Sequence, residues 1–129
     1  MYVKYLVKDN NPQSNIELEN PSIDQIIESI NSLDGDKHSY IMLCPEEDSE
    51  EMLVVGGGEN NEYICLYYNG DEYSLINPNE KSDEKVEIFM GQTSIRKKYE
   101  LMDIERVLLA VKTFAESGEM ENSLNWKKN

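Results

Sequence analysis

The sequence predicts an α+β domain in which two main helices pack on one face of a mostly antiparallel sheet of about five or six strands. Two segments, residues 22–33 and 103–117, repeat apolar side chains at helical spacing. Between them, short runs rich in Tyr, Ile and Val are separated by Gly, Asn, Pro or acidic residues, which is typical of an antiparallel meander. Amphipathic helices need an apolar surface to cover, and the sheet supplies it.

The first part of the chain predicts a strand, a loop and a helix. Tyr2–Val7 is a short apolar run, and the polar, Pro-containing stretch Asp9–Pro21 is typical of a loop. Ser22 and Gln25 have the spacing of a capping box at the start of an Ile-rich helical stripe. Gly35 is placed to end this helix, because glycine tolerates the left-handed conformation found after helix ends.

The middle of the chain predicts the sheet. Asn69 and Gly70 stand between two Tyr-rich runs and predict a type I′ hairpin turn, whose two central residues need positive φ. The run before them is apolar on both faces and is expected at the sheet centre. The predicted strands of this region are Tyr40–Cys44, Met52–Val55, Tyr63–Tyr68, Tyr73–Ile76 and Val86–Met90.

The last predicted element is a helix with recognisable ends. Asp103 is a suitable N-cap, the apolar stripe runs to Ser117, and Gly118 follows directly. Lys127–Asn129 is expected to fray. With 129 residues, no repeat and no low-complexity segment, the chain is expected to form a single domain over residues 1–129.

The chain is strongly acidic, with 26 acidic and 12 basic side chains and a net charge of −14. The acids are unevenly placed: residues 9–62 hold 14 acidic side chains and one basic side chain, Lys37. Such a field repels nucleic acid and anionic lipid and favours a cationic partner. A role in solubility alone is the alternative. The N-terminus lacks the apolar core of a secretory signal, and the protein is expected in the cytoplasm.

Few residues have the chemistry of a catalytic centre. His38, the one histidine, stands in a predicted loop, and Cys44 and Cys65 lie in apolar runs where reduced, buried thiols are expected. Gly56–Gly58 lacks the Lys-Ser/Thr of a P-loop and is interpreted as a bulge or tight turn. We therefore predict no enzyme activity, cofactor or metal ion. A ligand- or metal-dependent enzyme using the glycine turn and nearby carboxylates is the alternative.

Partner contacts are predicted from acidic loops and aromatic side chains. The acids that follow Cys44 form either a solvated loop or a contact surface. Trp126, after the last helix, either seals the edge of the core or anchors an interface. The tyrosines of the predicted strands likewise either pack in the core or contact a partner. The candidate partner-binding residues are Glu46, Glu47, Asp48, Glu50, Glu51, Glu59, Tyr67, Asp71 and Trp126.

Several motifs occur together between Tyr40 and Trp126. They are the run Leu53-Val54-Val55-Gly56-Gly57-Gly58, the Tyr-rich hairpin at Asn69-Gly70, Gly91-Gln92, Ala110-x-x-x-Phe114, Ser117-Gly118-Glu119 and Trp126. In this combination the chain resembles the first-numbered family of immunity proteins from bacterial polymorphic toxin systems.

The resemblance implies a non-enzymatic cytoplasmic protein that neutralises a cognate toxin domain, in polymorphic toxin systems that include contact-dependent growth inhibition. It implies a nuclease or nucleic-acid deaminase as the toxin, which agrees with the cationic partner expected from charge. Occlusion of the toxin's active site is the expected mechanism. An acidic adaptor or DNA-mimicking regulator of basic host proteins is the alternative function.

Overall fold

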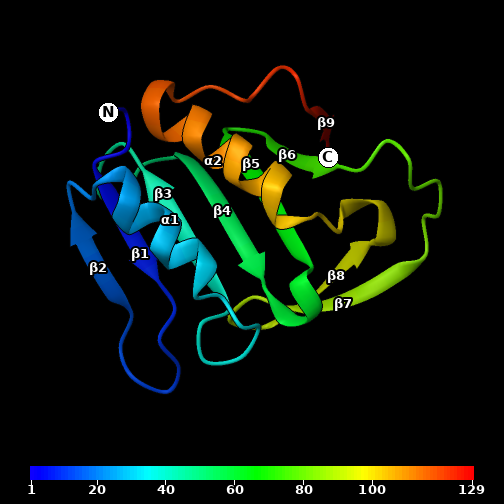
Figure 1. Ribbon diagram of the computed structural model, residues 1–129, viewed down its shortest axis with the longest axis horizontal. Coiled ribbons are helices and arrows are strands. Elements are labelled where there is room, and N and C mark those ends of the chain that lie inside the picture. Colours follow the sequence, from blue (N-terminus) through cyan, green and yellow to red (C-terminus); the bar gives the residue numbers. More distant parts are fainter.

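Seven antiparallel strands form one sheet, and a separate two-stranded hairpin lies against it (Figure 1). The computed structural model describes residues 1–129. The strand order in the main sheet is β2-β1-β3-β4-β5-β6-β9, and β7 pairs with β8. The strands are β1 (Tyr5–Lys8), β2 (Ile16–Glu19), β3 (Tyr40–Cys44), β4 (Glu51–Gly57), β5 (Tyr63–Asn69), β6 (Glu72–Ile76), β7 (Lys85–Phe89), β8 (Thr93–Lys97) and β9 (Asn125–Lys128). The predicted α+β class is confirmed.

Three of these strands were not predicted. Ile16–Glu19 lies in the predicted loop, but its alternation of apolar and acidic residues fits an edge strand, and Leu18 pairs with Leu6 of β1. Thr93–Lys97 completes the β7–β8 hairpin. The prediction that the C-terminus frays is wrong, because Trp126 pairs with Leu75 and brings the last residues into the sheet as β9.

The turn between β5 and β6 differs in detail from the prediction. The hairpin forms, and Tyr67 pairs with Tyr73. Of the Asn69-Gly70 pair only Gly70 has positive φ (101°), and Asn69 is the last residue of β5. The Asn69 side chain accepts a hydrogen bond from the Asp71 N–H at 3.3 Å. The turn therefore depends on one residue with positive φ, and the predicted type I′ turn is wrong.

Both helices begin at the predicted caps. Helix α1 (Ile23–Asn31) carries the full capping box: the Gln25 N–H donates to Ser22 Oγ at 3.1 Å, and the Ser22 N–H donates to Gln25 Oε1 at 2.9 Å. Helix α2 (Ile104–Ser117) is capped by Asp103, whose carboxylate accepts from the Arg106 N–H at 3.1 Å. Gly118 ends α2 with φ of 76°. The prediction that Gly35 ends the first helix is wrong, because α1 ends at Asn31 with Ser32 as its C-cap. The local hydrogen bonds of the N-caps explain why short-range patterns located the helix starts.

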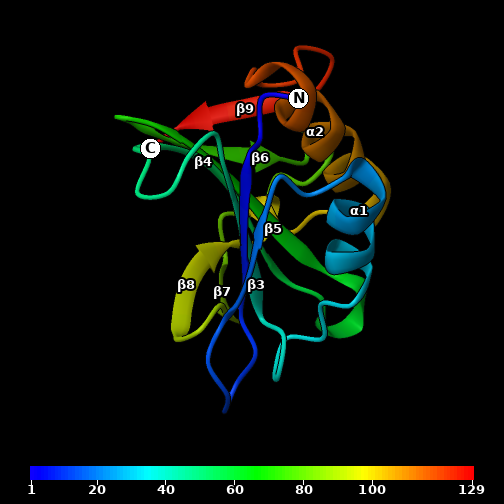
Figure 2. The ribbon, with the colours of Figure 1, turned by 90° about the vertical axis from the view of Figure 1, so that its left-hand side faces the viewer.

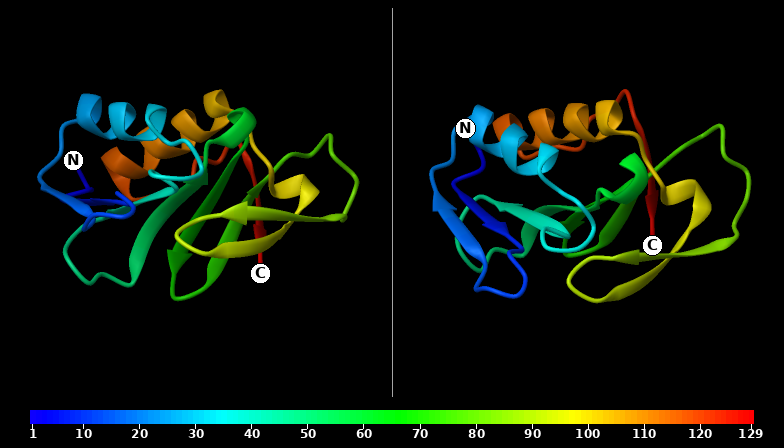
Figure 3. Two further views of the ribbon diagram at one scale, coloured as in Figure 1. Left: turned by 90° about the horizontal axis from the view of Figure 1, so that it is seen from below. Right: turned by 60° about the horizontal axis from the view of Figure 1, so that its bottom comes forward.

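The two helices cover one face of the sheet, and the core lies between them and the strands (Figures 2 and 3). Phe114 of α2 is fully buried and meets the rings of Tyr2 and Tyr67 edge to face, with centroids 5.6 and 5.8 Å away. Period-2 alternation sends Leu53 and Val55 of β4 into this core. The alternate side chains of β4, Met52 and Val54, point to the opposite face.

The β7–β8 hairpin lies on that opposite face (Figure 2). Its turn packs tightly, since a Cβ atom on Gly56 would stand 2.4 Å from the Met90 side chain. Arg96 of β8 lies 3.5 Å from buried Glu100 and 3.7 Å from Glu72 of β6. The hairpin therefore covers the part of the sheet near β6 and leaves the part near β1 open.

A buried serine ties the hairpin turn to the sheet. Ser39, which is fully buried, donates its hydroxyl to Asp9 Oδ2 at 2.6 Å and accepts from the Gly91 N–H at 2.7 Å. The Ser39 N–H also donates to Asp9, at 3.1 Å. One hydroxyl thus joins the end of β1, the start of β3 and the hairpin turn.

We expect Ser39→Ala to lower the free energy of unfolding by about 1–3 kcal/mol, because it removes one of the two Ser39 hydrogen bonds to the Asp9 carboxylate and leaves the Gly91 N–H without its partner. Urea denaturation checks this value. Ser14→Ala, an exposed serine with no side-chain hydrogen bond, is the matched control and should change stability by less than about 0.5 kcal/mol. Equal effects of the two substitutions would contradict the assigned role of Ser39.

Candidate partner-binding face

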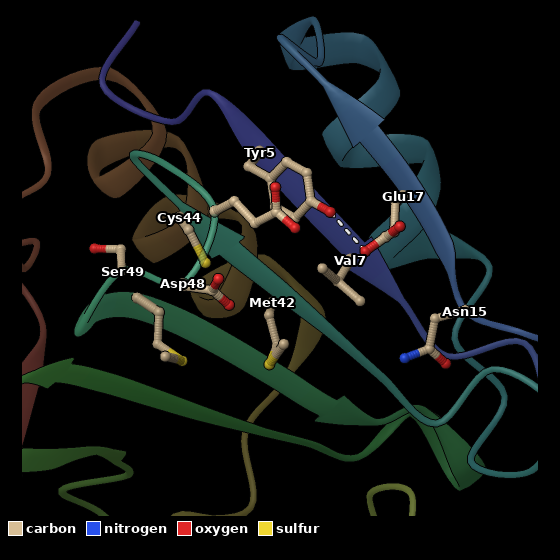
Figure 4. Close-up of a pocket in the computed structure, with 10 residues that line it drawn as sticks. Tyr5, Val7, Asn15, Glu17, Met42, Cys44, Asp48 and Ser49 are labelled. Carbon is tan, nitrogen blue, oxygen red and sulfur yellow. Dashed lines mark hydrogen bonds between the residues drawn. The ribbon is translucent and has the colours of Figure 1, made fainter.

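The open part of the sheet carries a hollow that we call the open-face groove (Figure 4). It has a volume of about 320 Å³ and is open to solvent. Its floor consists of apolar and sulfur-containing side chains from three neighbouring strands, and its rim is polar. The lining residues are Tyr5, Val7, Asn15, Glu17, Met42, Cys44, Glu47, Asp48, Ser49 and Met52.

Strand alternation explains the floor. In β1, Leu6 enters the helix-covered core, so Tyr5 and Val7 on either side of it face the groove. In β3, Met42 and Cys44 face the same way, and Tyr5 pairs directly with Cys44. These side chains form a second apolar cluster, separate from the main core. The face is apolar although no helix covers it.

Carboxylates form the rim on two sides of the floor. Glu17 lies on edge strand β2 opposite Val7, and Glu47 and Asp48 come from the loop between β3 and β4. The Tyr5 hydroxyl donates to Glu17 Oε1 at 2.6 Å, which holds this carboxylate at the groove. No lysine or arginine lines the groove, and none of the four ion pairs of the structure includes these three acids.

The pKa values of two floor residues follow from this negative surrounding. The hydrogen bond to Glu17, with desolvation and nearby carboxylates, raises the pKa of Tyr5 to about 12. Burial, together with Asp48, raises the pKa of the Cys44 thiol above its usual value. Cys44 is therefore a protonated thiol at neutral pH and contributes apolar surface to the groove, not a nucleophile.

A second hollow continues the face toward the hairpin turn. It shares Met42 with the open-face groove and is otherwise lined by Tyr40, Val54, Met90, Gly91 and Gln92. Its residues carry no charge. The open face thus changes from acid-rimmed near β2 to uncharged near the hairpin. The hairpin turn forms one side of the second hollow.

The structure brings some predicted site residues together. Glu46, Glu47, Asp48 and Glu50 are exposed and lie in the loop between β3 and β4, which borders the groove. Glu51 stands two positions before the core residue Leu53 in β4, so both side chains leave the same face of the sheet. Glu51 also accepts a hydrogen bond from the Tyr2 hydroxyl. Glu51 therefore belongs to the helix-covered side.

The other predicted residues lie elsewhere. Glu59 is exposed in a short 3₁₀ helix, η1 (Glu59–Asn61), and Asp71 in the β5–β6 turn lies 3.5 Å from Lys128. Tyr67 is buried in the main core, where its hydroxyl donates to the Gly118 carbonyl at 3.4 Å. Trp126 packs on Tyr67 with centroids 6.4 Å apart, and its indole N–H donates to the Glu121 carbonyl at 3.0 Å. In this structure Trp126 therefore seals the edge of the core.

Sequence reasoning missed Glu17 and the groove floor. The alternation Ile16-Glu17-Leu18-Glu19 was a signal for an acidic edge strand, but the surrounding polar residues suggested a loop. Met42 and Met52 were recognised as strand residues, and nothing local indicated that they face an uncovered surface.

The cysteines, the histidine and the glycine run that were considered for catalysis lie in the following positions. Cys65 is free, fully buried and on the helix-covered side, whereas Cys44 faces the groove. His38 Nδ1 lies 2.9 Å from the Asp9 carbonyl. A Cβ atom on Gly58 would stand 2.4 Å from the Leu33 carbonyl oxygen, so the glycine run is needed where two chain segments meet. No group of three or more His, Cys, Asp or Glu side chains is placed to hold a metal ion.

The fold and this surface define an α+β domain with an acid-rimmed apolar groove on an open sheet face. The chain belongs to the immunity protein family Imm1, whose family model matches residues 15–128. The match includes every strand and helix except β1, and it extends the resemblance seen from residue 40 onward. A comparison with curated proteins found no match. Neither α1 nor α2 has the length and apolar composition of a membrane-spanning helix.

Proposed function

We propose that this chain binds and neutralises a cognate cytotoxic effector domain by occluding its active site, without catalysing a reaction itself. The effector is a basic nuclease or nucleic-acid deaminase of a bacterial polymorphic toxin system, such as contact-dependent growth inhibition, and neutralisation takes place in the cytoplasm. The membership in Imm1 supports toxin neutralisation as the general role. The observation that supports the mechanism is the open-face groove, whose rim carboxylates take part in no ion pair within the chain.

Electrostatics favours this type of partner. Enzymes that act on nucleic acid bind phosphates through lysine and arginine, so their substrate clefts are basic. A chain with a net charge of −14 is steered toward such a cleft and away from nucleic acid and anionic lipid. The acidic loop after β3 and Glu17 would then face the cationic side chains, while the apolar floor excludes water between them.

Co-expression with the toxin encoded by the adjacent upstream gene tests the proposal. We expect this chain to restore growth and to be recovered with the toxin in a pull-down. A toxin domain from an unrelated system is the control and should be neither bound nor neutralised. No complex and no rescue would contradict the immunity function. Capture of basic host proteins in place of the toxin would instead support the adaptor alternative.

A further inference from the structure

We propose that the open-face groove receives one arginine side chain of the toxin, an inference that rests on the proposed function. The groove is small for a ligand site, since 320 Å³ is near the lower end of the range for small-molecule pockets. It is also bordered by charge on two sides. This combination suits a single long side chain with an apolar stem and a cationic end.

The floor matches the stem of such a side chain. Met42 and Met52 are flexible and polarisable, and they adapt to an aliphatic chain lying across them. Lysine and arginine bury their methylene groups against surfaces of this kind while the charged end reaches a polar rim. A wholly apolar side chain would cover the floor but would remove water from Glu17 and Asp48 without offering them a hydrogen-bond donor.

The rim selects arginine over lysine. The Tyr5 hydroxyl donates to Glu17 Oε1 at 2.6 Å and so holds this carboxylate at the rim (Figure 4). A guanidinium group donates to a carboxylate through two parallel N–H groups, which an ammonium group does not do. Glu47 and Asp48 add negative charge from the loop.

The surroundings exclude two other occupants. Lys4 lines an adjoining hollow that shares Tyr5 and Glu47 with the groove, but no lysine lines the groove itself. The groove is therefore not filled by a cation of the same chain. A second copy of this chain, also with a net charge of −14, would bring like charges together at this face.

The test uses single capped amino acids and needs no toxin. The protein is labelled at the methionine methyl groups and titrated with N-acetyl-arginine methylamide, followed by the lysine and citrulline analogues. Citrulline has the size and shape of arginine without its charge. We expect arginine to shift the Met42 and Met52 methyl signals, and to leave the signal of Met102, which is buried on the helix side, unchanged.

Substitutions locate the charged contact. Glu17→Gln keeps an acceptor for Tyr5 and removes the charge, and it should weaken arginine binding roughly threefold, the size expected for a solvent-accessible ion pair. Glu59→Gln, an exposed acid in η1, should leave the affinity unchanged. Equal shifts with arginine and citrulline, equal shifts with lysine, or no effect of Glu17→Gln would each overturn the arginine site. Growth rescue by the unmodified chain would stand in all three cases, so failure here is distinct from failure of the immunity function.

Discussion

Removing the acidic charge beside the groove is expected to slow association with the toxin by roughly tenfold or more at low salt. The variant combines Glu46→Lys, Glu47→Lys and Asp48→Asn. Asparagine is used at position 48 because Asp48 has φ of 60°, a conformation that Asn tolerates and Lys does not. Opposite charges steer diffusional encounter, so their reversal lowers the association rate and flattens its dependence on ionic strength. Stopped-flow or surface-based kinetics at several salt concentrations measure both.

The matched control changes the net charge by the same amount on the opposite side of the molecule. Glu28→Lys, Glu116→Lys and Glu119→Gln alter exposed acids on or beside the two helices. At 0.15 M salt the Debye length is about 8 Å, so charges on the far face act weakly at the groove. An equal loss of association rate in both variants would show that total charge, not the groove rim, attracts the toxin. A loss in the control variant alone would place the interface on the helix side.

Truncating Phe114 is expected to cost about 3–5 kcal/mol of unfolding free energy. The ring is fully buried and contacts both Tyr2 and Tyr67 edge to face, so Phe114→Ala removes two aromatic contacts and leaves a cavity between α2 and the sheet. The melting temperature should fall by roughly 10 °C or more. Denaturant titration and calorimetry measure the two quantities.

Leu109→Ala is the control for this substitution. Leu109 lies on the same helix but is 41% exposed, so its truncation should cost less than about 1 kcal/mol. A similar loss of stability in both variants would contradict the assigned role of the buried Phe114 contacts, because helical propensity favours alanine at both positions. Groove binding of arginine should survive in folded Phe114→Ala, because Phe114 lies on the opposite side of the sheet.

The helices and most strands were predictable because their signals are local. Ser22, Gln25 and Asp103 form their caps with backbone groups three residues away, and the sequence spacing already contains that geometry. The paired Tyr-rich strands around Gly70 also followed from adjacent residues. By contrast, β9 exists because Trp126 meets Leu75, and no pattern within residues 125–129 indicates that partner.

The predicted contact residues do not all lie on one surface, for the same reason. Glu46, Glu47 and Asp48 lie together because they are neighbours in one loop. Tyr67 was proposed as a contact because tyrosine is common at interfaces, but its alternation in β5 turns it toward Phe114. Which of the two faces a strand residue takes depends on the register of pairing, and one residue of slip reverses every side chain.

The sequence by itself determined the fold class, the helix starts and the excess of negative charge, since each is a property of composition or of residues a few positions apart. The tertiary structure alone decided the strand order, the placement of β7–β8 on the second face and the meeting of Glu17 with the loop after β3. These features join Tyr5, Glu17 and Asp48, which are separated by up to 43 positions, through backbone pairing between strands. Many strand registers have similar local pairing energies. Only the packing of the whole sheet against both helices makes one register more stable than the others.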